Sequence, residues 1–225
     1  MSDLRLAEDI KPTESYNERH LTALDSTPSD ISDRAPDGPY LGSNFHDNAP
    51  FRGKLTLPHE PGELLVIKGR IWGADTREPL AHVKVDIWQA NKNGDYDTEG
   101  ATDQNASSFI RARVYSDQHG YYEFETIHPG AYETQDQDGP FWRAPHIHFR
   151  VRCLGYEWLV TELFFSGDPH HDTDRFLVPA LVIQLSKKRR NDQDYEEGVF
   201  DIVLSPTVVP DGQNERDLIR PISHS

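Results

Sequence analysis

Two strand-like runs and a turn lie within residues 110–127, which read IRARVYSDQHGYYEFETI. Ile110–Tyr115 and Tyr121–Ile127 are rich in β-branched and aromatic residues, which pack well on a pleated surface. The run between them ends at Gly120, and glycine is typical of tight turns. The pattern predicts a β-hairpin with its turn at Asp117–Gly120.

Comparable runs continue the β pattern in both directions along the chain. In Val83–Gln89 the hydrophobic residues Val83, Val85 and Ile87 alternate with others, as in a strand with two different faces. The other expected strands are Leu64–Trp72, His146–Val151, Leu159–Phe165 and Val199–Leu204. Phe176–Leu185 fits either a helix or a strand. Short strands with few helical periods predict an all-β fold with a β-sandwich core and a few short helices.

The chain is expected to divide into three parts. Residues 1–60 are rich in Pro, Ser, Asp and Asn, and we expect an irregular N-terminal segment that wraps over the core, with one short helix at Tyr16–Leu24. Residues 61–205 form the β-sandwich domain, and residues 206–225 form a polar C-terminal tail. The basic run Lys187–Arg190 is expected to be a solvated loop.

Composition excludes some functions. The 225 residues carry a formal net charge of −15, which repels phosphate groups, so neither nucleic acid nor an anionic membrane is expected as a partner. No apolar run reaches the roughly 20 residues that cross a bilayer, and the N-terminus lacks a secretory pattern, so we expect a cytoplasmic protein. The single cysteine, Cys153, excludes an internal disulfide framework and multi-cysteine metal sites.

Four residues could form a metal site of nitrogen and oxygen ligands. His146 and His148 are two apart in an expected strand, so both point to one face, where they could bind a metal or simply lie on the surface. Tyr96 and Tyr132 each follow an expected strand on a loop, where they could be ligands or packed turn residues. A phenol with a pKa of about 10 binds only to a strong Lewis acid. Two phenolates with two imidazoles suit Fe(III).

Other polar residues allow further interpretations. His170 and His171 lie among Asp168, Asp172 and Asp174 and could form a second metal site from a loop. Arg143 is either a surface arginine or a cation aimed at an anion bound beside the metal.

Together these residues resemble the intradiol ring-cleavage dioxygenases, the family of catechol, hydroxyquinol and protocatechuate dioxygenases. The resemblance covers roughly residues 36–205. It rests on VKVDIWQANKNGDYD (83–97), RARVYSDQHGYYEFETIHPGAY (111–132) and FWRAPHIHFRV (141–151), and FFSGDP (164–169) and FDIVL (200–204) extend it.

The resemblance implies that a non-heme Fe(III) is bound by four residues. Tyr132 and His148 match the axial ligands of the family, and Tyr96 and His146 match the equatorial ones. Tyr132 is then also a base, because in the family this tyrosine leaves the metal when substrate binds.

The resemblance also implies a reaction. We expect both atoms of O2 to be inserted between the two hydroxyl-bearing carbons of a small aromatic diol, giving a cis,cis-muconate-type diacid in aromatic catabolism. Arg143 and Glu162 are expected to act in catalysis with Tyr132, and Tyr40, Arg143 and Glu162 to contact the substrate. The family also implies a homodimer or a larger oligomer.

Glu162 departs from the family, which usually has glutamine there. The carboxylate could pair with Arg143, which would lower its pKa, or accept a hydrogen bond from an extra donor on the substrate. A shifted strand would instead turn it to solvent. Acidic residues expected near the mouth, Glu133, Asp136 and Asp138, favour an uncharged catechol or a trihydroxylated ring over a carboxylate-bearing one.

Two other functions fit parts of the pattern. A non-catalytic β-sandwich binding module would need no iron. An Fe(II) oxygenase with two histidines and a carboxylate would use His146, His148 and Glu162.

Overall fold

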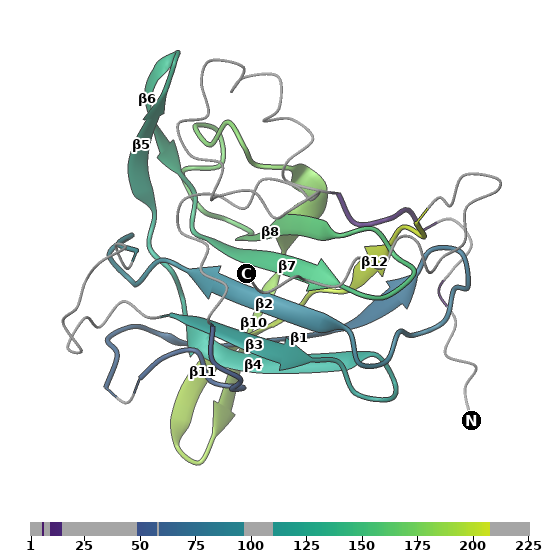
Figure 1. Cartoon of the computed structure of the whole chain (residues 1–225). Helices are drawn as coiled ribbons and strands as arrows, with labels where there is room; N and C mark the ends of the chain where they lie inside the picture. Colours follow the sequence, from purple (N-terminus) through teal and green to yellow (C-terminus); the bar gives the residue numbers. More distant parts are fainter. Residues whose placement is uncertain (1–5, 7–9, 15–48, 58, 97–109, 208–225) are drawn as a thin grey trace, which may run out of the picture.

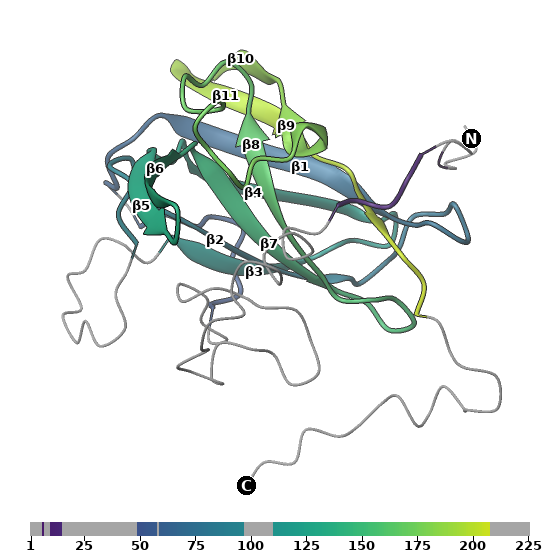
Figure 2. The same cartoon turned by 90° about the horizontal axis from the view of Figure 1, so that it is seen from above.

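The structure is a computed structural model that describes residues 6, 10–14, 49–57, 59–96 and 110–207. Two five-stranded sheets pack face to face, and a two-stranded hairpin stands at one end of them (Figures 1 and 2). The described regular elements are strands, apart from the short 3-10 helix η3 at Pro179–Leu181. This confirms the expected all-β fold with a β-sandwich core.

The first sheet is built around β1 (Leu64–Gly73), which has neighbours on both sides. On one side β1 pairs antiparallel with β4 (Tyr121–Ile127). On the other side it pairs parallel, first with β11 (Gln193–Val199) and then with β12 (Ile202–Leu204). The edge strand β10 (Leu185–Arg190) is antiparallel to β11.

A glycine in the middle of β1 is required by the passage from β11 to β12. The carbonyl oxygen of Phe200 lies 1.9 Å from the position that a Cβ of Gly69 would occupy. The same oxygen accepts a hydrogen bond of 2.6 Å from the buried hydroxyl of Tyr122. Only glycine allows the two backbones to approach this closely. The strand expected over Val199–Leu204 is therefore not continuous: Val199 ends β11, the ladder is interrupted at Phe200 and Asp201, and the chain pairs with the same edge of β1 again as β12.

The second sheet carries the candidate site, and its strand order is β3-β2-β7-β8-β9. Its strands are β2 (Lys84–Gln89), β3 (Arg111–Tyr115), β7 (His146–Arg152), β8 (Leu159–Phe165) and β9 (Val182–Ile183). The separate hairpin consists of β5 (Tyr132–Asp136) and β6 (Gly139–Arg143). In Figure 1 the hairpin projects from the sandwich, and the chain leads from its second strand directly into β7.

The hydrophobic core fills the space between the two sheets. Phe124 of β4 meets Phe149 of β7 with ring centroids 6.0 Å apart, and Phe149 also lies 5.3 Å from Phe200. All three side chains are buried. Because side chains alternate along a strand, the residues of β7 on either side of Phe149 point away from this core. The outer face of the second sheet is therefore where His146 and His148 lie.

The expected hairpin over residues 110–127 is wrong. β3 pairs with β2, and β4 pairs with β1 in the other sheet, so the two runs belong to different layers. The turn itself forms as expected, with Asp117 Oδ1 accepting the backbone N–H groups of His119 and Tyr121 and with Gly120 at a φ of 72°. Because the chain passes from one sheet to the other at this turn, the apolar faces of β3 and β4 both point into the space between the sheets. In a hydrogen-bonded hairpin the two strands would lie side by side in one sheet instead.

Two other segments differ from the sequence-based expectation. Phe176–Leu185 is neither one helix nor one strand: it contains a turn, η3, the two-residue strand β9 and the first residue of β10. Lys187–Arg190 is exposed, as expected, but it is not a loop. It forms most of edge strand β10, because each residue pairs with β11 across a tight turn at Asn191–Asp192, where both residues have positive φ. Basic residues on an exposed edge also discourage pairing with other chains.

Described parts of the first 60 residues lie against the sandwich. Leu55 is fully buried in the core, and its N–H donates to the carbonyl of Glu125. Thr13 exchanges hydrogen bonds with the backbone of Val203 in β12. The helix expected at Tyr16–Leu24 lies outside the described residues. Among the described residues, no helix has the length and apolar character to cross a membrane.

Candidate metal centre

The outer face of β7 places two imidazoles side by side. His146 and His148 have exposed fractions of 2% and 7%, and their Nε2 atoms are 3.2 Å apart. The interpretation of two surface histidines is therefore wrong. Cross-strand neighbours enclose His148: the indole of Trp88 on β2 stacks on its imidazole with centroids 4.9 Å apart and planes 3° from parallel. Glu162 lies opposite it on β8.

The hydroxyl of Tyr96 meets both imidazoles. Tyr96 follows β2, and its oxygen lies 3.0 Å from Nε2 of His148 and 3.3 Å from Nε2 of His146. The other ring nitrogen of His146, Nδ1, lies 2.7 Å from the carbonyl oxygen of Ala144. A carbonyl only accepts, so Nδ1 of His146 carries the proton and Nε2 presents its lone pair to the cluster.

Tyr132 approaches the cluster from the hairpin. Tyr132 was expected on a loop, but it is the first residue of β5, where it pairs with Arg143 at the end of β6. Its ring meets that of Tyr96 edge to face, with centroids 5.7 Å apart. The structure thus brings Tyr96, Tyr132, His146 and His148 together from three separate parts of the fold.

Burial sets the protonation of these four groups in the absence of a cation. It raises the pKa of Tyr96 well above its usual value and also raises the pKa of Tyr132. It lowers the pKa of both His146 and His148 well below the usual value, and the nearby Arg143 acts in the same direction. The imidazoles are therefore neutral and able to act as ligands. Phenolate forms at either tyrosine only if a strongly polarising cation replaces its proton.

The donor set fits one transition-metal ion. Two donors that each lie about 2.0–2.2 Å from a metal, at tetrahedral to octahedral angles, are separated by roughly 2.8–3.6 Å. The three distances among Tyr96 Oη and the two Nε2 atoms, 3.0, 3.2 and 3.3 Å, lie within this range. Imidazole nitrogen and phenol oxygen ligands without thiolate suit a hard or borderline transition-metal ion.

Arg143 lies beside the four residues and is held by two carboxylates. Its Nη2 donates to Glu162 Oε2 over 2.6 Å, and its Nε lies 3.1 Å from both carboxylate oxygens of Asp174. Its guanidinium also lies over the ring of Phe176, 4.7 Å from the centroid. Arg143 is 3% exposed, so the interpretation as a surface arginine is wrong. Its charge is already offset by neighbouring carboxylates.

Glu162 is fully buried, which excludes the shifted strand with this residue in solvent. It pairs with Arg143, but the expected lowering of its pKa is wrong: burial outweighs the arginine and raises the pKa of Glu162 to about 7. Its second oxygen, Oε1, lies 3.3 Å from Nδ1 of His148 and accepts no hydrogen bond from the described residues. A buried acceptor therefore faces the cluster.

Sequence reasoning missed two residues of this site. They are Trp88, which stacks on His148, and Asp174, which the sequence offered only as part of a possible second metal site. That second site does not form: among the described residues the single group of three convergent metal-binding side chains is His146, His148 and Glu162. His170 instead stacks on Trp142 with centroids 4.9 Å apart. Tyr40, the other expected substrate contact, lies outside the described residues.

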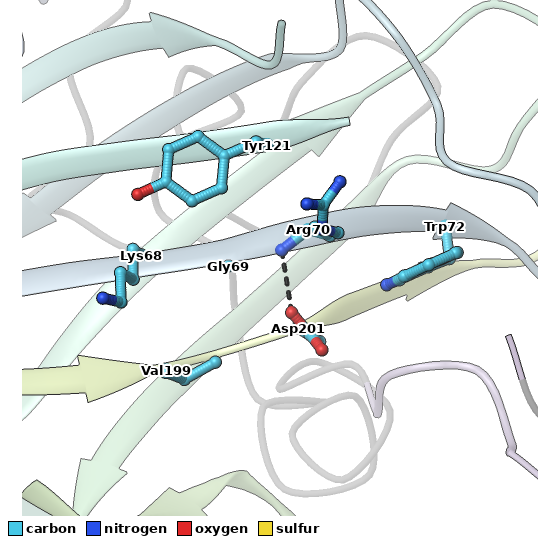
Figure 3. A pocket seen from close by; sticks show the side chains of 7 residues that line it. All are labelled: Lys68, Gly69, Arg70, Trp72, Tyr121, Val199 and Asp201. Atoms are coloured by element: carbon cyan, nitrogen blue, oxygen red, sulfur yellow. Dashed lines mark hydrogen bonds between the residues drawn. The ribbon is translucent and has the colours of Figure 1, made fainter. Parts of the chain in front are cut away.

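A hollow of about 290 Å³ lies on the other sheet, along the outer face of β1 (Figure 3). Its charged residues are satisfied within the protein. Lys68 pairs with Glu197 at 2.9 Å, Arg70 donates to the carbonyl of His119, and Asp201 accepts the N–H of Arg70. The hollow presents no cluster comparable to that on β7.

Comparisons with known proteins agree with this geometry. A family model described as Dioxygenase matches residues 37–206. The chain is 34% identical to 6-chlorohydroxyquinol 1,2-dioxygenase of Cupriavidus pinatubonensis over 158 residues, which cover 65% of this chain and 55% of that protein. It is 33% identical to chlorocatechol 1,2-dioxygenase of Rhodococcus opacus over 185 residues, covering 72% of this chain and 70% of that protein.

Solved structures show the same architecture. The catechol 1,2-dioxygenase of an Acinetobacter species superposes with a TM-score of 0.66 at 26% identity, covering 74% of this chain and 62% of that one. The 3-chlorocatechol 1,2-dioxygenase of Rhodococcus opacus superposes with a TM-score of 0.68 at 23% identity, covering 84% and 77% of the two chains. The chain thus spans little more than half the length of some of the proteins it resembles.

Proposed function

Because the chain belongs to the intradiol ring-cleavage dioxygenase family, we propose that it cleaves a small aromatic diol between its two hydroxyl-bearing carbons. Both atoms of O2 enter the product, a cis,cis-muconate-type diacid. No external reductant is needed, since the electrons come from the substrate. The observation that carries the proposal is the convergence of the Tyr96 hydroxyl with Nε2 of His146 and His148 beside the phenol of Tyr132.

In this proposal Tyr96, Tyr132, His146 and His148 hold a non-heme Fe(III). The bound ferric ion would supply the Lewis acidity that favours a catecholate and the electron acceptance that lets its ring react with O2. Tyr132 has a second role, because its phenolate oxygen accepts a proton from a substrate hydroxyl. Arg143 lies directly across the hairpin from Tyr132 and stabilises negative charge that develops on the substrate ring.

We propose an uncharged catechol or a trihydroxylated ring as the substrate. Asp174 alone offsets the charge of Arg143, and ionised Glu162 would make the three groups net negative. A ring carrying its own carboxylate would therefore find no unopposed cation here. Of the acidic residues expected at the mouth, Asp136 is paired with Arg175, while Glu133 and Asp138 are exposed on the same hairpin.

We also propose the remaining sequence-based features. These are the division at about residues 60 and 205, a homodimeric or larger assembly, and a cytoplasmic location. Tyr40 stays a predicted substrate contact.

Colour tests the proposed ligand set. The iron-loaded protein is expected to be red to purple, because phenolate donates charge to Fe(III). Tyr96→Phe removes one donor and is expected to shift the visible band and lower its intensity. The measurement is a visible spectrum at known iron content, with Tyr115→Phe, an exposed tyrosine of β3, as the control.

A colourless wild-type protein with full iron would contradict the proposal. It would favour the Fe(II) site of His146, His148 and Glu162 instead. A protein that binds no iron at all would favour the binding module.

Glu162→Gln tests the choice of substrate. The variant keeps the shape of the side chain but turns a charged acceptor into a neutral one, so a third hydroxyl on the ring loses a charge-assisted hydrogen bond. We expect the ratio of kcat/KM for hydroxyquinol to that for catechol to fall about tenfold, equivalent to about 1.4 kcal/mol. Exposed Glu133→Gln is the matched control. A ratio that stays within about twofold would exclude Glu162 from substrate selection.

A further inference from the structure

Asp174 lies at the centre of a hydrogen-bond network behind the candidate metal centre. It belongs to the turns between β8 and η3, and it is 7% exposed. Its Oδ1 accepts the backbone N–H of Phe176 over 2.9 Å, and its Oδ2 accepts the backbone N–H of Ala144 over 2.8 Å. Nε of Arg143 lies 3.1 Å from each oxygen. A single carboxylate thus receives three N–H groups.

The first consequence concerns the guanidinium of Arg143. Asp174 binds its Nε, Glu162 binds its Nη2, and Phe176 covers its face at 4.7 Å. Two carboxylates on different nitrogens of a planar group, with an aromatic ring against one face, fix both its position and its plane. A group that stabilises developing charge is effective only when it is held in place before the reaction.

The second consequence concerns His146. Oδ2 of Asp174 holds the N–H of Ala144, and the carbonyl of Ala144 receives the Nδ1 proton of His146 over 2.7 Å. Asp174 therefore anchors the backbone N–H of Ala144, and the carbonyl of Ala144 in turn orients the imidazole of His146. Partners of this kind behind a metal-binding histidine fix its tautomer and the direction of its other nitrogen.

We propose that Asp174 is a positioning residue for the ring-cleavage reaction proposed above, acting on Arg143 directly and on His146 through Ala144. This inference rests on the proposed function, but it concerns a residue that neither the sequence motif nor the donor set identifies. Asp174 does not face the reacting atoms. It determines the positions of the Arg143 guanidinium and the His146 imidazole.

The experiment is a double-mutant cycle with Asp174→Asn and Arg143→Ala in the iron-loaded protein. Asparagine replaces one acceptor oxygen with a donor, so an N–H group that the carboxylate held loses its partner. We expect D174N to lower kcat about a hundredfold, with a much smaller change in KM. In the R143A background, D174N is expected to change kcat by less than about tenfold, because the guanidinium that Asp174 positions is already absent. Exposed Asp172→Asn is the matched control.

Asp174→Glu separates position from charge. It keeps the negative charge, but its longer side chain cannot hold Arg143 and the Ala144 N–H in the same geometry, so we expect it to stay impaired. Full activity of D174E would overturn the proposal. A double variant whose loss of kcat equals, within about twofold, the product of the losses in D174N and R143A would also overturn it.

A measurement without iron makes the test independent of catalysis. In NMR spectra of the metal-free protein, the Nε–H of Arg143 and the N–H of Ala144 are expected to be protected from exchange and to lose that protection in D174N. Unchanged protection in D174N would overturn the positioning role even if the wild-type protein cleaved no diol. Inactivity of the iron-loaded wild type would itself contradict only the proposed function.

Discussion

Replacement of His148 by alanine is expected to weaken iron binding more than about a hundredfold. Loss of a partner behind a metal-binding histidine typically lowers affinity by about 10–100-fold, and the variant removes the ligand itself. His148 is also held on two sides, because Trp88 stacks on one face of its ring and Glu162 lies at its Nδ1 edge. Iron content after dialysis against a chelator of known affinity measures the effect, together with the loss of the visible band.

His119→Ala is the matched control for this experiment. His119 is exposed on the turn between β3 and β4, remote in sequence from the proposed ligands, and the variant should keep its iron. His170→Ala should keep it too, since His170 stacks on Trp142. Full iron retention in His148→Ala would show that the ion is bound elsewhere.

Replacement of Asp86 by alanine is expected to lower the free energy of unfolding by about 3–5 kcal/mol. Asp86 lies on the outer face of β2, one step along the strand face from Trp88, and is 1% exposed. Its Oδ2 accepts from Arg150 Nη2 over 2.7 Å and lies 3.3 Å from Arg152, and its Oδ1 pairs with Arg113. Removing the carboxylate leaves the buried guanidinium of Arg150 and the partly buried ones of Arg113 and Arg152 without the anion between them.

Urea unfolding of the metal-free protein measures this effect without a contribution from iron binding. Arg189→Ala is the matched control, because Arg189 pairs with Asp192 and Asp194 at a side chain that is 63% exposed. Exposed pairs contribute only about 0–1 kcal/mol. A change of that size in Asp86→Ala would mean that the arginines are held by other contacts.

The sequence predicted the strands better than their partners. Alternation in Val83–Gln89 and the run around His146 marked β2 and β7 correctly, because burial of one face leaves a local pattern. Pairing leaves no such pattern. A short turn at Asp117–Gly120 suits a hairpin and also a crossing between layers, and only the packing of both apolar faces decides between them.

In the candidate site, too, some residues are marked by a local sequence pattern and others are not. Tyr96, Tyr132, His146 and His148 could be proposed from the sequence because residue type and family motif mark them. Asp174 could not, since it reaches Arg143 from a turn 31 residues further along the chain. The pKa of Glu162 was misjudged because the sequence reveals a charged neighbour more readily than the depth at which both groups are buried.

The position of β1 has a consequence for the order in which the domain assembles. β1 is made early, and β4 can cover one of its edges soon afterwards, but the partners of its other edge, β11 and β12, are near the end of the domain. Until they emerge from the ribosome, a long strand with an apolar face keeps one row of backbone groups unpaired. Such an edge invites association with other nascent chains, and its closure brings together distant parts of the sequence. Pairing of β11 and β12 with β1, rather than formation of the metal centre, is then the step that closes this edge.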